Sequence, residues 1–217
     1  MNYLTRRRRA LIMSACNNVD ISSLVFSYTG TWTDSVMEID GSQYRVLQLK
    51  SDGTLTLDPR MVNRIPFDVW CVRQGDTGED GKSSPMTQYA TGSDHGIAGS
   101  CPQGGGAGSV KYYHAPDGSD GIAGGWAMQL GVKATSASYT ASVGSPANLN
   151  GIISVSNTTR TGTAWFTLPT SNNGAGGAGG KGKTNAKCSL CGESWGNSAG
   201  SGKSGTPGIV VIRIPIA

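Results

Sequence analysis

Glycine recurs at every third position in several stretches of this chain, and no other feature of the sequence constrains the fold as strongly. The glycines with this spacing fall into four groups: Gly75, Gly78 and Gly81; Gly118, Gly121 and Gly124; Gly174, Gly177 and Gly180, with Gly176, Gly179 and Gly182 beside them; and Gly202, Gly205 and Gly208. A period of three matches the polyproline-II helix, which has three residues per turn and makes no internal hydrogen bonds. Glycine along one edge lets neighbouring backbones approach closely enough to bond to each other. Interior glycine costs an α-helix about 1 kcal/mol per residue, which argues against α-helices in these stretches. We therefore predict a bundle of short glycine-rich segments within one chain.

Two other kinds of structure are rich in glycine, and the sequence argues against both. Collagen requires long unbroken triplets with much proline, whereas these runs are short and the 217-residue chain has only 9 prolines. A flexible glycine and serine linker would rarely contain aromatic residues such as Tyr112, Tyr113, Trp126 and Trp195. Packed segments are the better interpretation.

The remaining parts of the chain have the patterns of β-strands. Apolar or alternating stretches predict strands at residues 24–28, 36–39, 44–50, 54–57, 67–73, 126–130, 138–143, 152–155, 163–168 and 209–214. Asp52-Gly53 is a strong hairpin signal, so we expect residues 44–50 and 54–57 to pair with each other. The run 209–214 is continuous and β-branched, which predicts a strand buried on both faces.

Positive charge is concentrated near the amino end. The 18 Lys and Arg residues exceed the 14 Asp and Glu residues by four, and Arg6, Arg7, Arg8 and Arg9 account for that excess. A nucleic-acid-binding protein would spread its cations over a face or a helix. We therefore expect no nucleic-acid partner.

The first fifteen residues can form a short helix or arm, with Leu4, Leu11 and Ile12 on one side. The apolar run that follows the arginines is four residues long, which is too short for a secretory signal. No stretch of about 18 apolar residues occurs, so no membrane insertion is expected. We interpret residues 1–15 as an ordered anchoring segment.

The cysteines do not form a recognisable disulfide framework. The five are Cys16, Cys71, Cys101, Cys188 and Cys191, an odd and scattered set for which free thiols are the expected state. Cys188 and Cys191 have the spacing of a zinc knuckle, but no second pair of ligands stands nearby and a structural zinc site needs four. We expect no metal and no cofactor, while a symmetric oligomer could still pool ligands from several chains.

The order of these elements resembles the glycine-rich domain of bacteriophage tail and tail-fibre proteins. The strand-turn-strand at 44–57 is similar to the opening of that domain, and 67–75 is similar to a strand that runs directly into glycine. Residues 139–144 are similar to an internal strand ending in glycine. The nearest match is 200–213, where glycines precede an isoleucine and valine run and an arginine. The resemblance covers roughly residues 42–217.

The chain departs from this family at residues 75–81, where members often have an unbroken glycine tract. The arginines followed by Ala10-Leu11 are similar to the start of small tail proteins from phages of Gram-positive hosts. The resemblance implies a virion component at the tail tip or fibre, oligomeric and able to contact the host surface. It makes other phage tail proteins the expected partners, and a trimer our first expectation for the assembly.

The sequence contains no recognisable catalytic constellation. It has two histidines and lacks a nucleophile elbow, a zinc-protease motif and a complete phosphate-binding loop. The tract 196–204 ends in Gly202-Lys203-Ser204 but has Asn197 where the opening glycine is required. Glu79 and Asp80 with Asp94 could supply paired carboxylates for a glycan hydrolase. Our prediction is that the chain is not an enzyme.

Aromatic and histidine residues inside the glycine-rich stretches are the candidates for receptor contact, because aromatic faces stack on sugars and pack on protein loops. These candidates are Tyr89, His95, Tyr112, Tyr113, His114 and Trp195. Each could instead fill space left by glycine. The candidates for docking on the virion are Arg6, Arg7, Arg8, Arg9, Leu11 and Ile12.

The sequence thus predicts a mainly β protein with a short N-terminal helix or arm, a small antiparallel sheet, and a glycine-rich β domain that can include polyglycine-II-like segments. Residues 1–40 would be a virion-docking segment and residues 41–217 the glycine-rich β domain. The expected function is a structural phage tail-tip or tail-fibre subunit located in the virion, which binds a host cell-surface glycan or protein. An extracellular carbohydrate-binding module and a cell-wall glycan hydrolase are the alternatives.

Overall fold

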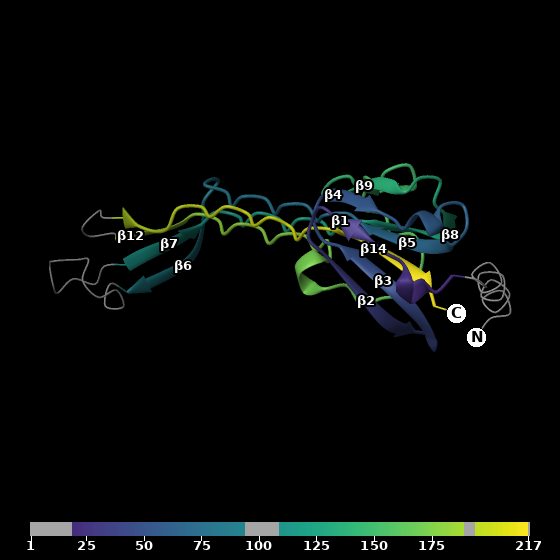
Figure 1. The fold of residues 1–217 in the computed structure, drawn as a ribbon. Coiled ribbons are helices and arrows are strands. Elements are labelled where there is room, and N and C mark those ends of the chain that lie inside the picture. Colours follow the sequence, from purple (N-terminus) through teal and green to yellow (C-terminus); the bar gives the residue numbers. More distant parts are fainter. Residues whose placement is uncertain (1–18, 94–108, 189–193, 217) are drawn as a thin grey trace. The chain divides into compact units, whose positions relative to one another are not determined.

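The protein is mainly β, and its structure, a computed structural model, describes residues 19–93, 109–188 and 194–216 (Figure 1). These residues contain three antiparallel sheets and short 3-10 turns, with no α-helix among them. The described part of the chain includes no helix with the length and apolar character to cross a bilayer. The predicted helix at residues 1–15 lies outside the described residues.

The chain divides into two compact units, each discontinuous in sequence. The first unit contains the residues up to Gly75, those from Ala123 to Ala175 and those from Thr206 onward. The second unit contains Asp76–Ile122 and Gly176–Gly205. The chain therefore passes from one unit to the other four times.

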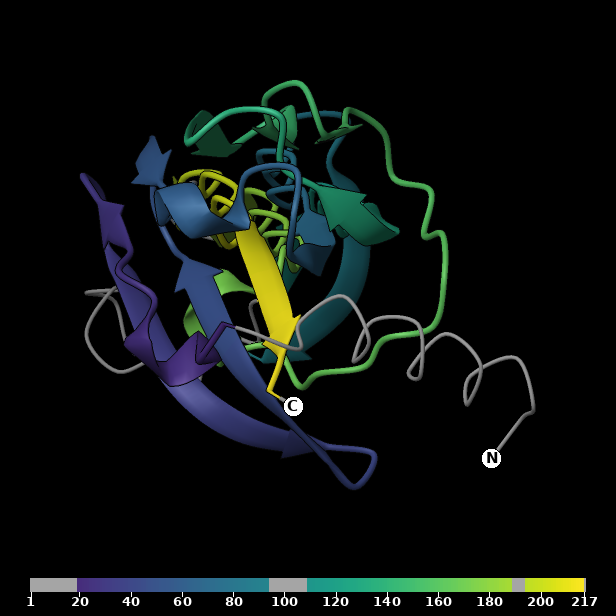
Figure 2. The same ribbon diagram turned by 45° about the vertical axis from the view of Figure 1, so that its right-hand side comes forward.

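Two five-stranded sheets pack face to face in the first unit (Figure 2). One has the order β1-β4-β9-β10-β11 and the other β2-β3-β14-β5-β8. The strand bounds are β1 Ser27–Tyr28, β2 Trp32–Ile39, β3 Ser42–Leu49, β4 Gly53–Thr56, β5 Pro66–Val72, β8 Trp126–Lys133, β9 Ser138–Val143, β10 Ala147–Leu149, β11 Ile153–Val155 and β14 Ile209–Pro215. The 3-10 turns are η1 Ile21–Ser23, η2 Pro59–Met61 and η4 Thr170–Asn172.

Strand β14 occupies the centre of its sheet, between β3 and β5, and forms the yellow arrow in Figure 2. Val210, Ile212 and Ile214 belong to the cluster that fills the space between the two sheets, and each is 0% exposed. Ile209 and Val211 belong to a second cluster on the opposite face. The prediction that this run is buried on both faces is confirmed.

The predicted hairpin at Asp52-Gly53 is wrong, because β3 and β4 belong to different sheets. The tight hairpin instead joins β2 to β3, where Ile39 pairs with Ser42 across Asp40 and Gly41. Both turn residues have positive φ, 52° and 71°, which is the geometry of the type I′ turn.

Asp52-Gly53 forms a corner between the two sheets. The Asp52 carboxylate accepts a hydrogen bond from the Val143 amide in β9 at 2.8 Å. A Cβ at Gly53 would lie 2.8 Å from the backbone nitrogen of Gly30, so the close backbone approach requires glycine. Asp52-Gly53 therefore does not form a hairpin but lies where the chain crosses from one sheet to the other.

One predicted strand is absent and five observed strands were not predicted. Residues 163–168 form an irregular segment on the outer face of the β2-β3-β14-β5-β8 sheet. Their aromatic side chains pack on that face, but the segment has no neighbouring strand with which to pair. The unpredicted strands are β6 Thr87–Ser93, β7 Ser109–His114, β10 in the first unit, β12 Thr184–Cys188 and β13 Ser194–Trp195. Four of them form the single sheet of the second unit, in the order β13-β12-β7-β6.

The rest of the second unit consists of four glycine-rich segments, which we number in chain order: 76–82, 115–122, 176–183 and 196–205. They have no regular strand or helix assignment, yet they are joined by backbone hydrogen bonds at every third residue. Asp76, Glu79 and Lys82 of the first segment donate to the second, and Gly118 and Gly121 of the second donate to the third. The segments are therefore packed against one another, as the glycine spacing predicts.

Candidate binding surface

The sheet of the second unit brings together most of the residues that the sequence analysis proposed for receptor contact. Tyr89 lies in β6, Tyr112, Tyr113 and His114 lie in β7, and Trp195 lies in β13. His95 lies outside the described residues. No strand was predicted at these positions, yet five of the six candidates lie in strands.

The strand register places two of these aromatic residues in one row. Tyr112 pairs with Ala186 of β12, and Ala186 pairs with Trp195 of β13. On the other side of β7, Tyr112 pairs with Ala90, and a register shift next to it leaves Tyr89 as the extra residue of a β-bulge.

His114 ends β7 beside a small polar network. Its Nε2 lies 3.1 Å from Asp117 Oδ1, and Lys181 Nζ donates to Asp117 Oδ2 at 2.8 Å. The Gly182 amide donates to the same carboxylate at 2.8 Å. That backbone bond, together with Lys181, lowers the pKa of Asp117 to about 2. The carboxylate is thus ionised and occupied as an acceptor, which suits a structural role better than proton transfer.

Three aspartates act in the same way along the glycine segments. Asp117 and Asp120 of the second segment accept from the Gly182 and Gly179 amides of the third. Asp80 of the first segment accepts from an amide of the fourth, at 2.8 Å. Each carboxylate satisfies a backbone donor that has no carbonyl partner, and so fixes the register of adjacent segments.

The third segment contains five glycines in eight residues and bonds to each of the other three segments. Its amides donate to the first segment, and its carbonyls accept from the second and the fourth. A Cβ at Gly176 would collide with the carbonyl of Gly121, and a Cβ at Gly177 would collide with that of Lys203. Both glycines of the pattern Gly-Gly-Xaa are therefore required, the first by the second segment and the next by the fourth.

Acidification should loosen this part of the second unit. The folded-state pKa of Asp117 is about 2, below its usual value of 3.8, so the stability that it contributes is present above about pH 4 and is lost as the pH falls through about 2. We expect hydrogen exchange of the Gly182 amide to accelerate over that interval. Asp117→Asn should remove the pH dependence, while Asp40→Asn should leave it unchanged; equal pH profiles for Asp117→Asn and the native chain would contradict this assignment.

The structure adds nothing that favours a metal or thiol site. No cluster of three metal-ligating side chains occurs among the described residues. Cys188 ends β12 opposite Val110, and Cys16, Cys101 and Cys191 lie outside the described residues. Cys71 is buried in β5, and burial raises the pKa of its thiol to about 12, so it is not poised as a nucleophile.

The carboxylates considered for glycan hydrolysis are engaged by backbone amides in the glycine segments. Asp80 accepts from Gly202, and Glu79 accepts from the Ser119 amide at 3.4 Å. Asp94 lies outside the described residues. Each described carboxylate that was considered for hydrolysis therefore already accepts a hydrogen bond from the backbone.

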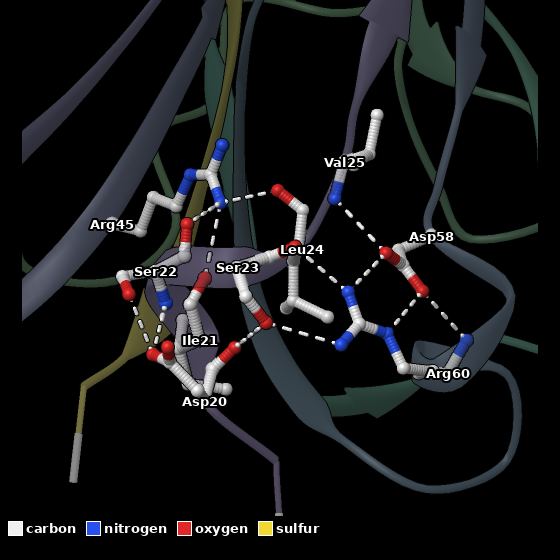
Figure 3. A network of polar contacts seen from close by, with 9 residues as sticks. All are labelled: Asp20, Ile21, Ser22, Ser23, Leu24, Val25, Arg45, Asp58 and Arg60. Carbon is white, nitrogen blue, oxygen red and sulfur yellow. Dashed lines mark hydrogen bonds and ion pairs between the residues drawn. The ribbon is translucent and has the colours of Figure 1, made fainter.

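The residues proposed for docking on the virion, Arg6–Arg9, Leu11 and Ile12, lie outside the described residues. The chain that follows them is held by two arginines and two aspartates, which we call the clasp: Asp20, Arg45, Asp58 and Arg60 (Figure 3). Asp20 caps η1 by accepting from the Ser22 amide at 2.9 Å. The clasp fixes residues 20–25, near the start of the described chain.

Each arginine of the clasp binds main-chain carbonyls. Arg45 Nη1 donates to Ile21 O at 3.0 Å and to Leu24 O at 2.6 Å, while its Nη2 pairs with Asp34 at 2.6 Å. Arg60 binds Ser23 O at 2.8 Å and also pairs with Asp58. Several carbonyls of one short segment are thus satisfied by two side chains (Figure 3).

Asp58 completes the clasp by accepting from the Val25 amide at 2.9 Å. Its hydrogen bond with Arg60, followed by its backbone hydrogen bonds, holds the pKa of this buried carboxyl well below its usual range. We expect Asp58→Asn to raise hydrogen exchange at Val25 by about tenfold or more, since a hydrogen bond to a charged group contributes about 1.5–3 kcal/mol. Asp40→Asn, in the β2–β3 turn, should leave exchange at Val25 unchanged. An unaltered rate in Asp58→Asn would show that the clasp does not hold the segment.

An aromatic cluster in the first unit was not identified from the sequence. Trp70 of β5 packs edge-on against Trp126, with 5.7 Å between the ring centroids. It also packs against Trp165 in a tilted arrangement, with 5.6 Å between the centroids. The Arg213 guanidinium lies 4.2 Å from the centre of the Trp165 ring and 5.0 Å from that of Tyr44. The alternation of β14 could have revealed it, because Arg213 falls on the same face as Ile209 and Val211.

Comparisons with known proteins give no relative for this arrangement. No protein-family model, no curated protein and no solved structure matches the chain. The functional argument therefore depends on the residues and their geometry alone.

Proposed function

We propose that this chain is a non-enzymatic bacteriophage tail protein, a tail-tip or tail-fibre subunit that assembles as a homo-oligomer in the virion. The observation that carries the proposal is the set of glycine segments bonded to one another at every third residue. We infer that they form a polyglycine-II-like bundle, whose backbone bonds and close contacts make it stiff. Stiffness of this kind suits a protein that must hold a surface in place.

The sheet of the second unit supports a receptor-binding role for the same subunit. It contains Tyr89, Tyr112, Tyr113, His114 and Trp195, and aromatic residues of this kind are enriched where proteins bind partners. The partner is a host cell-surface glycan or protein. Residues 1–40 dock on other tail proteins, with the clasp fixing the point at which the basic arm leaves the first unit.

An extracellular carbohydrate-binding module is the second candidate. It is favoured by the gathering of aromatic residues in one sheet, which would serve a free-standing sugar-binding protein equally well. A tail protein should be found in virions, whereas such a module should be found on cell walls or in the medium.

Antibodies against the purified chain distinguish the two. We expect them to label one end of the tail in electron micrographs of virions produced from the encoding genome. Virions without label, together with label on the bacterial wall, would reject the tail assignment and favour the carbohydrate-binding module. Light scattering of the purified chain then tests the expected trimer.

A further inference from the structure

The first unit contains an open groove of about 1080 Å³ that the proposed function does not use. It lies over the outer face of the β2-β3-β14-β5-β8 sheet, beside the irregular segment 161–167. Its lining combines ring, thioether and aliphatic side chains with hydroxyl and carboxylate groups. The residues used below are Glu38, Thr161, Thr163, Trp165, Thr167 and Arg213.

The floor of the groove is built around Trp165. The Arg213 guanidinium lies over the Trp165 ring at 4.2 Å from its centre, and Trp70 packs against the ring in a tilted arrangement at 5.6 Å. The Trp165 side chain is partly exposed, yet its indole Nε1 is buried and has no hydrogen-bond partner. The exposed part of the side chain is therefore carbon, and it gives the groove an apolar surface.

The walls provide hydrogen-bonding groups that the protein leaves unused. The hydroxyls of Thr161, Thr163 and Thr167 make no hydrogen bond to any described residue, and neither does the carboxylate of Glu38. All four residues are exposed. A flat apolar surface beside several free hydroxyl and carboxylate groups is the lining that a sugar ring requires, since sugars have an apolar face and a polar edge.

The segment that forms one wall is fixed to the sheet at its first residues. The Thr161 amide donates to Trp126 O at 2.8 Å, and the Trp126 amide donates to Thr159 O at 3.0 Å. The Arg160 guanidinium covers the Trp126 ring at 4.5 Å. Gly162 follows with a φ of +99°, which favours glycine, so the turn into the groove is specified locally.

The charges of the groove favour a neutral ligand. Arg213 is the cation among the described lining residues, and it is already paired with Asp68 at 2.8 Å, with both side chains 13% exposed. It therefore supplies no free charge for an anion. Glu38 and Asp40 at the rim would repel an acidic polymer.

We propose that this groove binds a neutral oligosaccharide, with one sugar ring stacked on Trp165 and its hydroxyls bonded to Glu38, Thr161 and Thr163. The groove belongs to the first unit and shares no residue with the receptor-contact candidates of the second. The proposal does not depend on the tail assignment, so virion labelling and sugar binding can fail separately.

Calorimetric titration of the full chain with neutral hexasaccharides tests the proposal, using glucose, mannose and N-acetylglucosamine hexamers as probes. We expect at least one to bind with a dissociation constant between about 10 µM and 1 mM. A galacturonic acid hexamer should not bind. If none of the neutral probes binds at about 5 mM, or if the acidic hexamer binds more tightly, the proposal is wrong.

Variants locate the binding. Trp165→Phe should weaken it by about fivefold or more, and Thr163→Val and Glu38→Gln by about three- to tenfold each. Thr56→Val, an exposed threonine on the other sheet, is the matched control. If Trp165→Phe does not fold, the two exposed substitutions carry the test. Unchanged affinity in both would overturn the assignment, as would a peptide of residues 1–18 binding in the groove in place of sugar.

Discussion

Replacing Gly177 with valine should unfold the second unit while the first unit keeps its structure. Any Cβ at this position would collide with the carbonyl of Lys203. The backbone cannot move aside, because the Gly177 amide donates to Asp76 O at 2.9 Å and its carbonyl accepts from Gly121 at 2.7 Å. We expect a loss of more than about 4 kcal/mol, at the upper end of single substitutions.

Hydrogen exchange read separately for the two units measures this effect. Amides of the second unit should lose protection, while those of β3, β5 and β14 should keep it. Gly200→Ala is the matched control, because its added Cβ would lie 3.4 Å from the nearest heavy atom, Lys181 N. We expect that change to alter stability by less than about 1 kcal/mol. Equal behaviour of the two variants would show that the segments are not packed as described.

Arg213→Ala should destabilise the first unit by about 3–5 kcal/mol, since it leaves one partner of a buried ion pair without its counter-charge. Asp68 and Arg213 pair at 2.8 Å and are each 13% exposed. The substitution also removes the cation that lies over the Tyr44 and Trp165 rings. Urea unfolding followed by tryptophan fluorescence reports the loss, because Trp165 contacts Arg213 and also packs against Trp70.

The matched control is an exposed ion pair. Lys181 pairs with Asp117 at the same distance, 2.8 Å, but its side chain is 86% exposed. Lys181→Ala should therefore leave the free energy of unfolding nearly unchanged. A double substitution, Asp68→Asn with Arg213→Met, should recover part of the stability lost in Arg213→Ala, because no unpaired charge remains buried. A small effect of Arg213→Ala in the same assay would show that the pair is hydrated.

The sequence predicts correctly those features that depend on a local pattern of residues with one physical property. Glycine every third residue predicts close backbone packing, because nothing else removes the Cβ. The run 209–214 predicts its own burial on both faces, because it has apolar side chains on each. Both predictions depend on local pattern alone, and both are confirmed by the contacts.

The wrong predictions concern features that depend on contacts between residues far apart in the sequence. Asp40-Gly41 and Asp52-Gly53 carry the same turn signal, yet only the first forms a hairpin, since the partner of β4 is β9 and lies more than 80 residues away in the sequence. Strands β7 and β13 were not predicted, because glycine-rich stretches flank their aromatic residues and mask the strand pattern. The groove at Trp165 could not be predicted, because it depends on how the irregular segment 161–167 lies on the sheet.

The position of β14 has a consequence for folding during synthesis. This strand separates β3 from β5 in the finished sheet, so each of them lacks one of its two neighbours until residues 209–215 have been synthesised. The fourth glycine segment likewise bonds to the first, which is made more than a hundred residues earlier. A nascent chain that lacks these late residues should therefore expose unpaired strand edges, which favour aggregation until the long-range pairing is complete.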